Sequence, residues 1–194
     1  MQNLRLVLAA AVFAGLADIG WSTAAAPQEL SGRVVGVTDG DTLTVLTAGR
    51  RPVKVRLLAV GAPETSCKGR KTERESDLFG DAFCVERGQP YGKAAKKALS
   101  QLTFGRDVIV RVRGTSHERL VGQVLVGQTD AGLAMLQQGF ACYAAQFGRR
   151  HLSDEEQRAY AQAHEAAKAA RRGMWAREDA QCDDEYRARQ RSAL

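Results

Sequence analysis

The stretch SGRVVGVTDGDTLTVLTAGRRPVKVRLLAV, residues 31–60, contains three short runs rich in β-branched residues. The runs cover residues 33–38, 42–47 and 53–57, and Asp39-Gly40-Asp41 and Ala48-Gly49-Arg50 separate them. Alternating apolar and polar residues, clearest in the third run, are typical of a strand with one buried face, and Gly and Asp between such runs are typical of turns. The stretch therefore predicts three consecutive β-strands.

Downstream, helical and strand patterns alternate. Apolar positions at helical spacing predict helices over residues 91–102, 130–138 and 153–172, and runs rich in Val predict strands over residues 108–112 and 120–126. Residues 67–89 lack periodicity and are interpreted as a long loop. The order β-β-β-α-β-β-α-α predicts an α+β fold, an OB-fold five-stranded Greek-key barrel with about three packed helices.

The ends of the last two helices carry specific signals. Ser153 followed three residues later by Glu156 is a capping box. Gly139 and Gly173 are suited to the left-handed residue that stops a helix, with Arg171 and Arg172 expected in the final turn.

The first 25 residues are predicted to be a signal peptide. Arg5 precedes an apolar run over residues 6–17, and small residues follow, with cleavage expected after Ala24 or Ala25. An uncleaved membrane anchor is the alternative, but a bilayer span needs roughly 20 apolar residues and this run is shorter. We therefore expect a secreted or periplasmic protein without a membrane segment, with one domain over residues 30–178 and a charged, frayed tail over residues 179–194.

Charge and cysteine content narrow the class of protein. The net charge of +6 favours a polyanionic partner such as nucleic acid or an anionic surface. Zinc is not expected, because the cysteines lack CxxC spacing and the three histidines lack ligand spacing. Four cysteines in an oxidising compartment predict two disulfides, for which three connectivities are open. Cys67–Cys84 and Cys142–Cys182 are favoured because each closes a local loop.

Four side chains match the needs of phosphodiester cleavage. The reaction needs an oriented water, neutralisation of charge on the phosphoryl oxygens and stabilisation of the leaving oxygen. Carboxylates hold cations or activate water, and guanidiniums fork onto phosphate oxygens. Asp41, Glu64, Arg56 and Arg119 supply these groups. Each is ambiguous alone, since Asp-Gly-Asp is more often a turn and Arg56 on an alternating strand is more often a solvated residue.

The combination in this order resembles the staphylococcal nuclease (thermonuclease) family over about residues 32–175. The DGDT element of the family stands at residues 39–42, and the resemblance continues to Arg172-Gly173-Met174-Trp175 after the last helix. The remaining matches to the family motifs are Arg56, Leu57, Val60, Pro63, Glu64 and Arg119. The positions of Cys67 and Cys84 resemble those of cysteine-paired exported members.

The resemblance implies a monomeric, sugar-nonspecific nuclease acting on DNA and RNA. Glu64 would act on the attacking water, and Arg56 and Arg119 would bind and stabilise the phosphoryl group. Asp41 would ligate Ca²⁺ together with the backbone carbonyl of Ala62. Cleavage would release the 5′ oxygen and leave a 3′ phosphate.

The sequence also departs from the family pattern. Gly61 stands where the family has a second metal-binding Asp, so Ca²⁺ is expected to bind weakly. His117 and Glu118 replace a Tyr-Gly pair, and Ser116 replaces a basic residue that contacts phosphate. Ala145 replaces a nucleotide-stacking Tyr, with Phe147 nearby. Ser116 and Phe147 are kept as candidate substrate-binding residues.

Three functions therefore stay open. The favoured one is an active exported nuclease. The second is a catalytically weak or inactive OB-fold protein that binds nucleic acid, which the Gly61 departure favours. The third, a disulfide-stabilised structural protein of the envelope, has no positive support.

Overall fold

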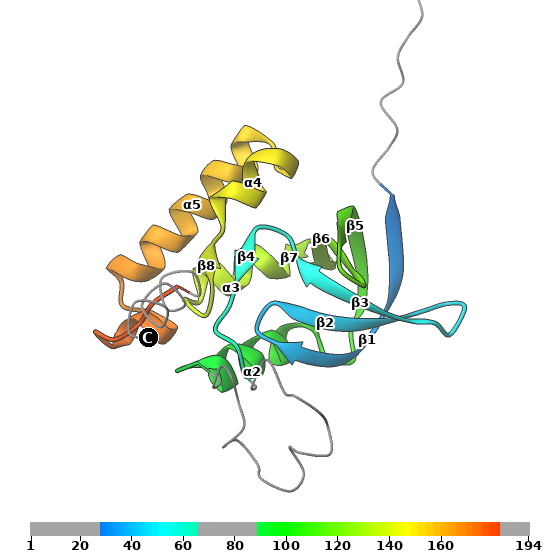
Figure 1. Ribbon diagram of the computed structural model, residues 1–194, viewed down its shortest axis with the longest axis horizontal. Coiled ribbons are helices and arrows are strands. Elements are labelled where there is room, and N and C mark those ends of the chain that lie inside the picture. Colours follow the sequence, from blue (N-terminus) through cyan, green and yellow to red (C-terminus); the bar gives the residue numbers. More distant parts are fainter. Residues whose placement is uncertain (1–27, 66–88, 183–194) are drawn as a thin grey trace, which may run out of the picture.

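The computed structural model describes residues 28–65 and 89–182, arranged as a barrel with helices packed around it (Figure 1). The predicted signal peptide, Cys67, Cys84 and most of the predicted tail lie outside the described residues. The strands are β1 (Glu29–Asp39), β2 (Thr42–Thr47), β3 (Pro52–Leu57), β4 (Val60–Gly61), β5 (Asp107–Ser116), β6 (Arg119–Val126), β7 (Thr129–Asp130) and β8 (Cys142–Tyr143). The helices are α2 (Gly92–Thr103), α3 (Ala131–Gln137), α4 (Ala145–His151) and α5 (Asp154–Ala169), followed by the short 3₁₀ helix η2 (Gly173–Ala176).

Five strands close into a barrel. The order β3-β2-β1-β5-β6 is antiparallel throughout, and a parallel pairing of β3 with β6 completes the circle. In that pairing Val55 lies opposite Leu120 and Leu57 lies opposite Gly122. Register shifts in β1 curve the long first strand, as bulges do in small barrels. The closed barrel confirms the predicted OB-type α+β fold.

The barrel interior is filled by alternating residues of the strands. Side chains at most 3% exposed project inward from β2, β3, β5 and β6: Leu43, Val45, Val55, Leu57, Val108, Val110 and Val124. Each such side chain contributes roughly 1.5–3 kcal/mol through burial. Helix α2 buries Ala95, Ala98 and Leu99, three residues of its predicted apolar face.

The described residues form four α-helices, where the sequence predicted about three. The additional helix is α4, seven residues between β8 and α5 that the sequence did not predict. Helix α5 ends at Ala169, so Arg171 and Arg172 follow the helix instead of forming its last turn, a correction of the prediction. Gly139 (φ 75°) has the left-handed conformation predicted for the residue that stops α3, but after α5 that position is taken by Arg171 (φ 51°), and Gly173 (φ 55°) begins η2.

A buried polar network joins β6 to the helices. Gln123, 4% exposed on β6, donates from Nε2 to Glu156 Oε1 on α5 (2.9 Å) and to Asp130 Oδ2 before α3 (3.3 Å). Tyr160 OH donates to the same Asp130 oxygen at 2.7 Å. Burial, reinforced by Asp130, raises the pKa of Tyr160, so its hydroxyl stays a donor. This network ties α3, which packs on β6, and α5, which packs on α3, to the barrel.

The capping box of α5 is present in both directions. Glu156 N donates to Ser153 Oγ (3.2 Å), and Ser153 N donates to Glu156 Oε2 (2.8 Å). Burial acts to raise the pKa of Glu156, but hydrogen bonds from Ser153 and Gln123 outweigh it and lower the pKa below 4.5. The contribution of this carboxylate to stability is therefore present above about pH 4.5 and is lost as the pH falls through the pKa of Glu156 in the folded protein.

Within the described residues, no helix is long and apolar enough to cross a bilayer.

Replacing Ser153 with Ala should lower the free energy of unfolding by about 1 kcal/mol, because the cap of α5 is lost. Urea denaturation followed by circular dichroism measures the change. Ser100→Ala, inside α2, is the matched control: it removes no cap and gains helix propensity. Equal stability of the two variants would contradict the role given to Ser153.

Candidate active site

Asp41 is the most constrained of the candidate residues. It sits in the β1–β2 turn with a side chain only 3% exposed. Arg56 on β3 meets it with two nitrogens, Nη2 to Oδ2 at 2.9 Å and Nη1 to Oδ1 at 3.2 Å. Thr42 Oγ1 donates to Oδ1 (2.8 Å), and Ala62 N donates to Oδ2 (3.2 Å). A charge this buried must be paired and hydrogen-bonded, and here both oxygens are.

The main chain of Asp41 is fixed as well. Its carbonyl accepts the amide of Leu57 at 2.8 Å, which ties the turn to the end of β3. Gly40 is required by close packing: a Cβ there would lie 2.6 Å from Ala95 Cβ on α2 and 2.7 Å from Ala62 Cβ. The turn therefore sits in a fixed position between α2 and the chain that follows β4.

Asp39, the other carboxylate of the DGD turn, has a different role. Its Oδ1 accepts the amide of Thr65 (3.2 Å) and the hydroxyl of Thr65. The same hydroxyl is also 3.2 Å from Thr38 O. Asp39 therefore fastens the chain just after Glu64 to the turn that carries Asp41.

Register places Arg56 and Arg119 on the same outer face of the barrel. Arg56 pairs with Val121 across the parallel β3–β6 pair, and Arg119 lies two residues before Val121 on β6. Residues two apart on a strand point to the same face. The inward residues on either side of Arg56, Val55 and Leu57, are at most 2% exposed, so the arginines project outward.

Glu64 is 7% exposed, and its backbone is held on both sides. Gln89 N donates to Glu64 O (2.9 Å), and Glu64 N donates to Gln89 Oε1 (3.2 Å). Gly92, at the start of α2, packs so closely that a Cβ there would lie 2.1 Å from Glu64 O. Gln89 and Gly92 thus support the candidate base, although no sequence signal pointed to Gln89.

Gly61 lies in β4 opposite Cys142 of β8. A Cβ at Gly61 would have no neighbouring atom within 4 Å, and its φ is outside the left-handed region that disfavours side chains. The local structure would accept an Asp here, so the missing carboxylate is not imposed by backbone geometry.

The remaining candidates, Ser116 and Phe147, are less constrained. Ser116 ends β5 opposite Arg119, with its Oγ 3.3 Å from His117 Nδ1. His117 has φ 56° in the hairpin between β5 and β6. Phe147 lies on α4 and is 58% exposed, so its ring faces solvent.

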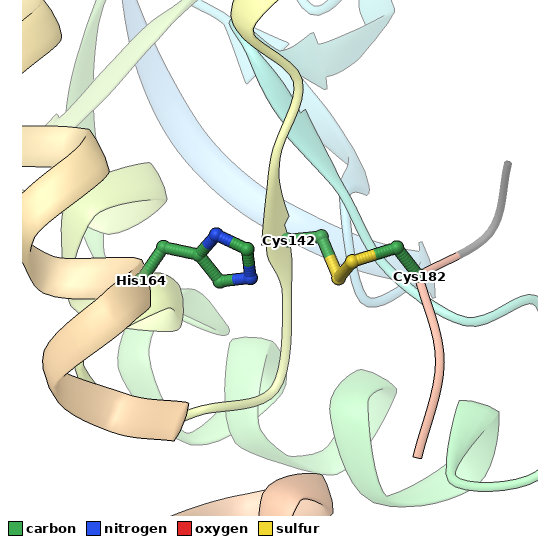
Figure 2. Close-up of side chains that lie close together, drawn as sticks. All are labelled: Cys142, His164 and Cys182. Carbon is green, nitrogen blue, oxygen red and sulfur yellow. A yellow bond between two sulfur atoms is a disulfide. The ribbon is translucent and has the colours of Figure 1, made fainter. Parts of the chain in front are cut away.

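One predicted disulfide is present. Cys142 and Cys182 are bonded, with their Cα atoms 5.7 Å apart and a sequence separation of 40. The other predicted pair, Cys67–Cys84, lies outside the described residues. Figure 2 shows His164 of α5 pointing toward the Cys142–Cys182 bond. Among the described residues these three form the one cluster of metal-ligand type, and its two sulfurs are consumed by the disulfide.

The candidate ligands of a cation, the Asp41 carboxylate and the Ala62 carbonyl, are oxygens, which suit a hard cation. The one carboxylate among them, Asp41, is already neutralised by Arg56. A groove elsewhere, lined by residues of β1, β2 and β5 such as Arg33, Thr47 and Ile109, contains none of the candidate residues.

Gly92→Ala should destabilise the protein by about 1–3 kcal/mol, because the methyl group would collide with the Glu64 carbonyl. Gly114→Ala is the control: its Cβ would meet nothing within 4 Å, so a change below about 0.5 kcal/mol is expected. Thermal and urea unfolding measure both. A Gly92→Ala protein as stable as the Gly114→Ala protein would show that the contact with Glu64 is looser than described.

The sequence is similar to that of known nucleases and related proteins. Residues 54–177 match the family described as "Staphylococcal nuclease homologue". The "Uncharacterized endonuclease" of Haemophilus influenzae is 32% identical over 74% of this chain, which spans 65% of that protein. The "Micrococcal nuclease" of Shigella flexneri is 30% identical over 79% of this chain and 78% of its own length. "Protein ParB" of Escherichia coli is 30% identical over 76% of this chain and 73% of its own length. The chain belongs to the family of staphylococcal nuclease homologues.

Proposed function

We propose that the protein is a nuclease that hydrolyses phosphodiester bonds of DNA and RNA. One observation carries the proposal. Arg56, which lies on the same barrel face as Arg119, makes two contacts to the Asp41 carboxylate, and Asp41 accepts a hydrogen bond from the loop that carries Glu64. Guanidiniums, a buried carboxylate and a fixed second carboxylate are the groups that in-line hydrolysis of a phosphodiester requires.

Each of these residues has a different role in the proposed reaction. Arg56 and Arg119 hold the non-bridging phosphoryl oxygens and stabilise their charge as the attacking water adds. Glu64 accepts the proton of that water, since its backbone is fixed by Gln89 and the chain two residues before it is hydrogen-bonded to Asp41. The bond to the 5′ oxygen breaks, which leaves a 3′ phosphate. Ser116 and Phe147 are proposed to contact the flanking nucleotides.

A hard divalent cation, Ca²⁺ in our proposal, would be held by Asp41 and the carbonyl oxygen of Ala62. When bound, it supplies positive charge to the phosphoryl oxygens. Binding should be weak for two reasons. Gly61 supplies no second carboxylate, and Arg56 already occupies both oxygens of Asp41.

We also propose that the protein is exported and monomeric, with nucleic acid as its partner. The apolar run near the N-terminus and the Cys142–Cys182 disulfide support export, since disulfides persist in oxidising compartments. The net charge of +6 supports a polyanionic substrate.

A second candidate function is nucleic-acid binding with little or no turnover. Gly61, which removes one expected ligand of the cation, is the observation that favours it. The two functions differ in whether Glu64 matters for cleavage, so the same experiment separates them.

Mature oxidised protein should digest single-stranded DNA and RNA with Ca²⁺ and lose activity with a chelator.

Glu64→Gln should lower kcat more than about 100-fold, because general-base catalysis typically contributes at least that much. Arg119→Lys should cost more than about tenfold, since a point charge cannot fork onto two oxygens. Product end-group analysis should find 3′ phosphates.

Arg119 is preferred to Arg56 for this test. Arg56 neutralises the buried Asp41, so changing it also destabilises the fold, contrary to the expectation of a solvated residue. If the protein binds single-stranded DNA but neither wild type nor Glu64→Gln cleaves it, the protein is a binder and the nuclease proposal fails.

Gly61→Asp should lower the Ca²⁺ concentration needed for half-maximal cleavage by about tenfold, because it adds an anionic ligand beside Asp41. Gly61→Asn is the matched control, since it has the same shape without the charge. The open space around Gly61 predicts that both variants fold normally. Unchanged Ca²⁺ dependence in a normally folded Gly61→Asp protein would show that the cation does not bind at Asp41.

A further inference from the structure

Residues 177–182, which we call the C-terminal clasp, are attached to two distant parts of the chain. Asp179 Oδ1 accepts a hydrogen bond from Tyr91 OH at 2.6 Å and another from Arg177 Nε at 3.2 Å. At the other end, Cys182 is bonded to Cys142 of β8 (Figure 2). Both attachment points lie one or two residues from backbone that contacts the candidate active site.

The first attachment leads to Glu64. Tyr91 precedes α2 and lies between Gln89, which exchanges two hydrogen bonds with the Glu64 backbone, and Gly92, which packs against the Glu64 carbonyl. Tyr91 has a left-handed backbone (φ 68°, ψ −4°) although it is not glycine. Such a conformation costs roughly 1–2 kcal/mol and persists where the surroundings hold it, often beside functional sites. Its bond to Asp179 is one such restraint.

The second attachment leads to Asp41. Cys142 pairs with Gly61 and Tyr143 pairs with Val60 in the short β4–β8 ladder. The amide of Ala144 also donates to Ala59 O at 2.9 Å. The next residue after Gly61 is Ala62, whose amide donates to Asp41. The disulfide therefore restrains β8, the strand that pairs with β4, and β4 leads directly into the loop whose Ala62 amide contacts Asp41.

We propose that the C-terminal clasp positions both halves of the active site, with Tyr91 and Asp179 acting on Glu64 and the Cys142–Cys182 disulfide acting on the loop at Gly61 and Ala62. The inference rests on the proposed nuclease function. These residues do not touch the reacting atoms; they are positioning residues. Because α2 is anchored in the core by Ala95 and Leu99, both fully buried, loss of the clasp disturbs the site more than the fold.

Tyr91→Phe in the full oxidised chain tests the first attachment, since it removes only the hydroxyl. We expect kcat on single-stranded DNA to fall about tenfold with KM within about twofold, because misplacement of a catalytic group lowers turnover. Asp179→Ala should match it, whereas Asp179→Asn, which keeps an oxygen acceptor, should retain most of the activity. Tyr160→Phe is the control: it removes a Tyr–Asp bond of similar length (2.7 Å) and should lower stability without lowering kcat.

The double variant Cys142→Ser, Cys182→Ser tests the second attachment. It should raise the Ca²⁺ concentration for half-maximal cleavage severalfold, measured below its unfolding temperature. Amide hydrogen exchange of residues 59–65 gives a readout that does not depend on activity, and it should be faster in Tyr91→Phe and in the double variant than in wild type.

The outcomes separate the two proposals. An inactive wild type would refute the nuclease function, while faster exchange of residues 59–65 would still support the clasp. An active wild type whose Tyr91→Phe and Asp179→Ala forms keep full kcat and unchanged exchange would overturn the clasp. A Tyr160→Phe protein with the same kcat loss as Tyr91→Phe would also overturn it, since the effect would then be general loosening.

Discussion

The ion pair between Asp41 and Arg56 is the constraint on which the rest of the site depends. A carboxylate with 3% exposure cannot remain charged without partners, and Arg56, Thr42 and the Ala62 amide supply them. These partners come from β3, from the start of β2 and from the chain after β4. One buried charge therefore fixes the relative positions of three segments, and the loop toward Glu64 continues from the last of them.

The contacts that stabilise the fold here involve the same residues that we propose for catalysis. Arg56 stabilises Asp41 and is also the proposed ligand of phosphate, while Asp41 is also the proposed ligand of a cation. If a cation neutralised Asp41 instead, Arg56 would be free to bind the phosphoryl oxygens. Because Gly61 supplies no second carboxylate, the Asp41–Arg56 ion pair would be favoured over cation binding. The same geometry accounts for the weak affinity for a cation that we propose.

Much of the fold could be predicted because its signals are local. Alternation along residues 53–57 and the capping box at Ser153 depend on neighbours in sequence, and the structure confirms both. Helix α4 was missed because it has seven residues and no side-chain cap. The sequence also indicated Asp41, Arg56, Glu64 and Arg119 as members of one candidate site. It could not indicate that Arg56 pairs with Asp41, or that Gln89 supports Glu64 across 25 residues, because such contacts depend on the closed barrel.

The most direct test of this account is a crystal structure of the oxidised protein with Ca²⁺ and a phosphorothioate dinucleotide that resists cleavage. We expect an anomalous calcium peak beside the Asp41 carboxylate and the Ala62 carbonyl. We also expect the phosphorothioate group between Arg56 and Arg119, with Glu64 facing its phosphorus. A phosphorothioate bound elsewhere on the surface, with the Asp41–Arg56 pair intact and no calcium beside it, would contradict the account.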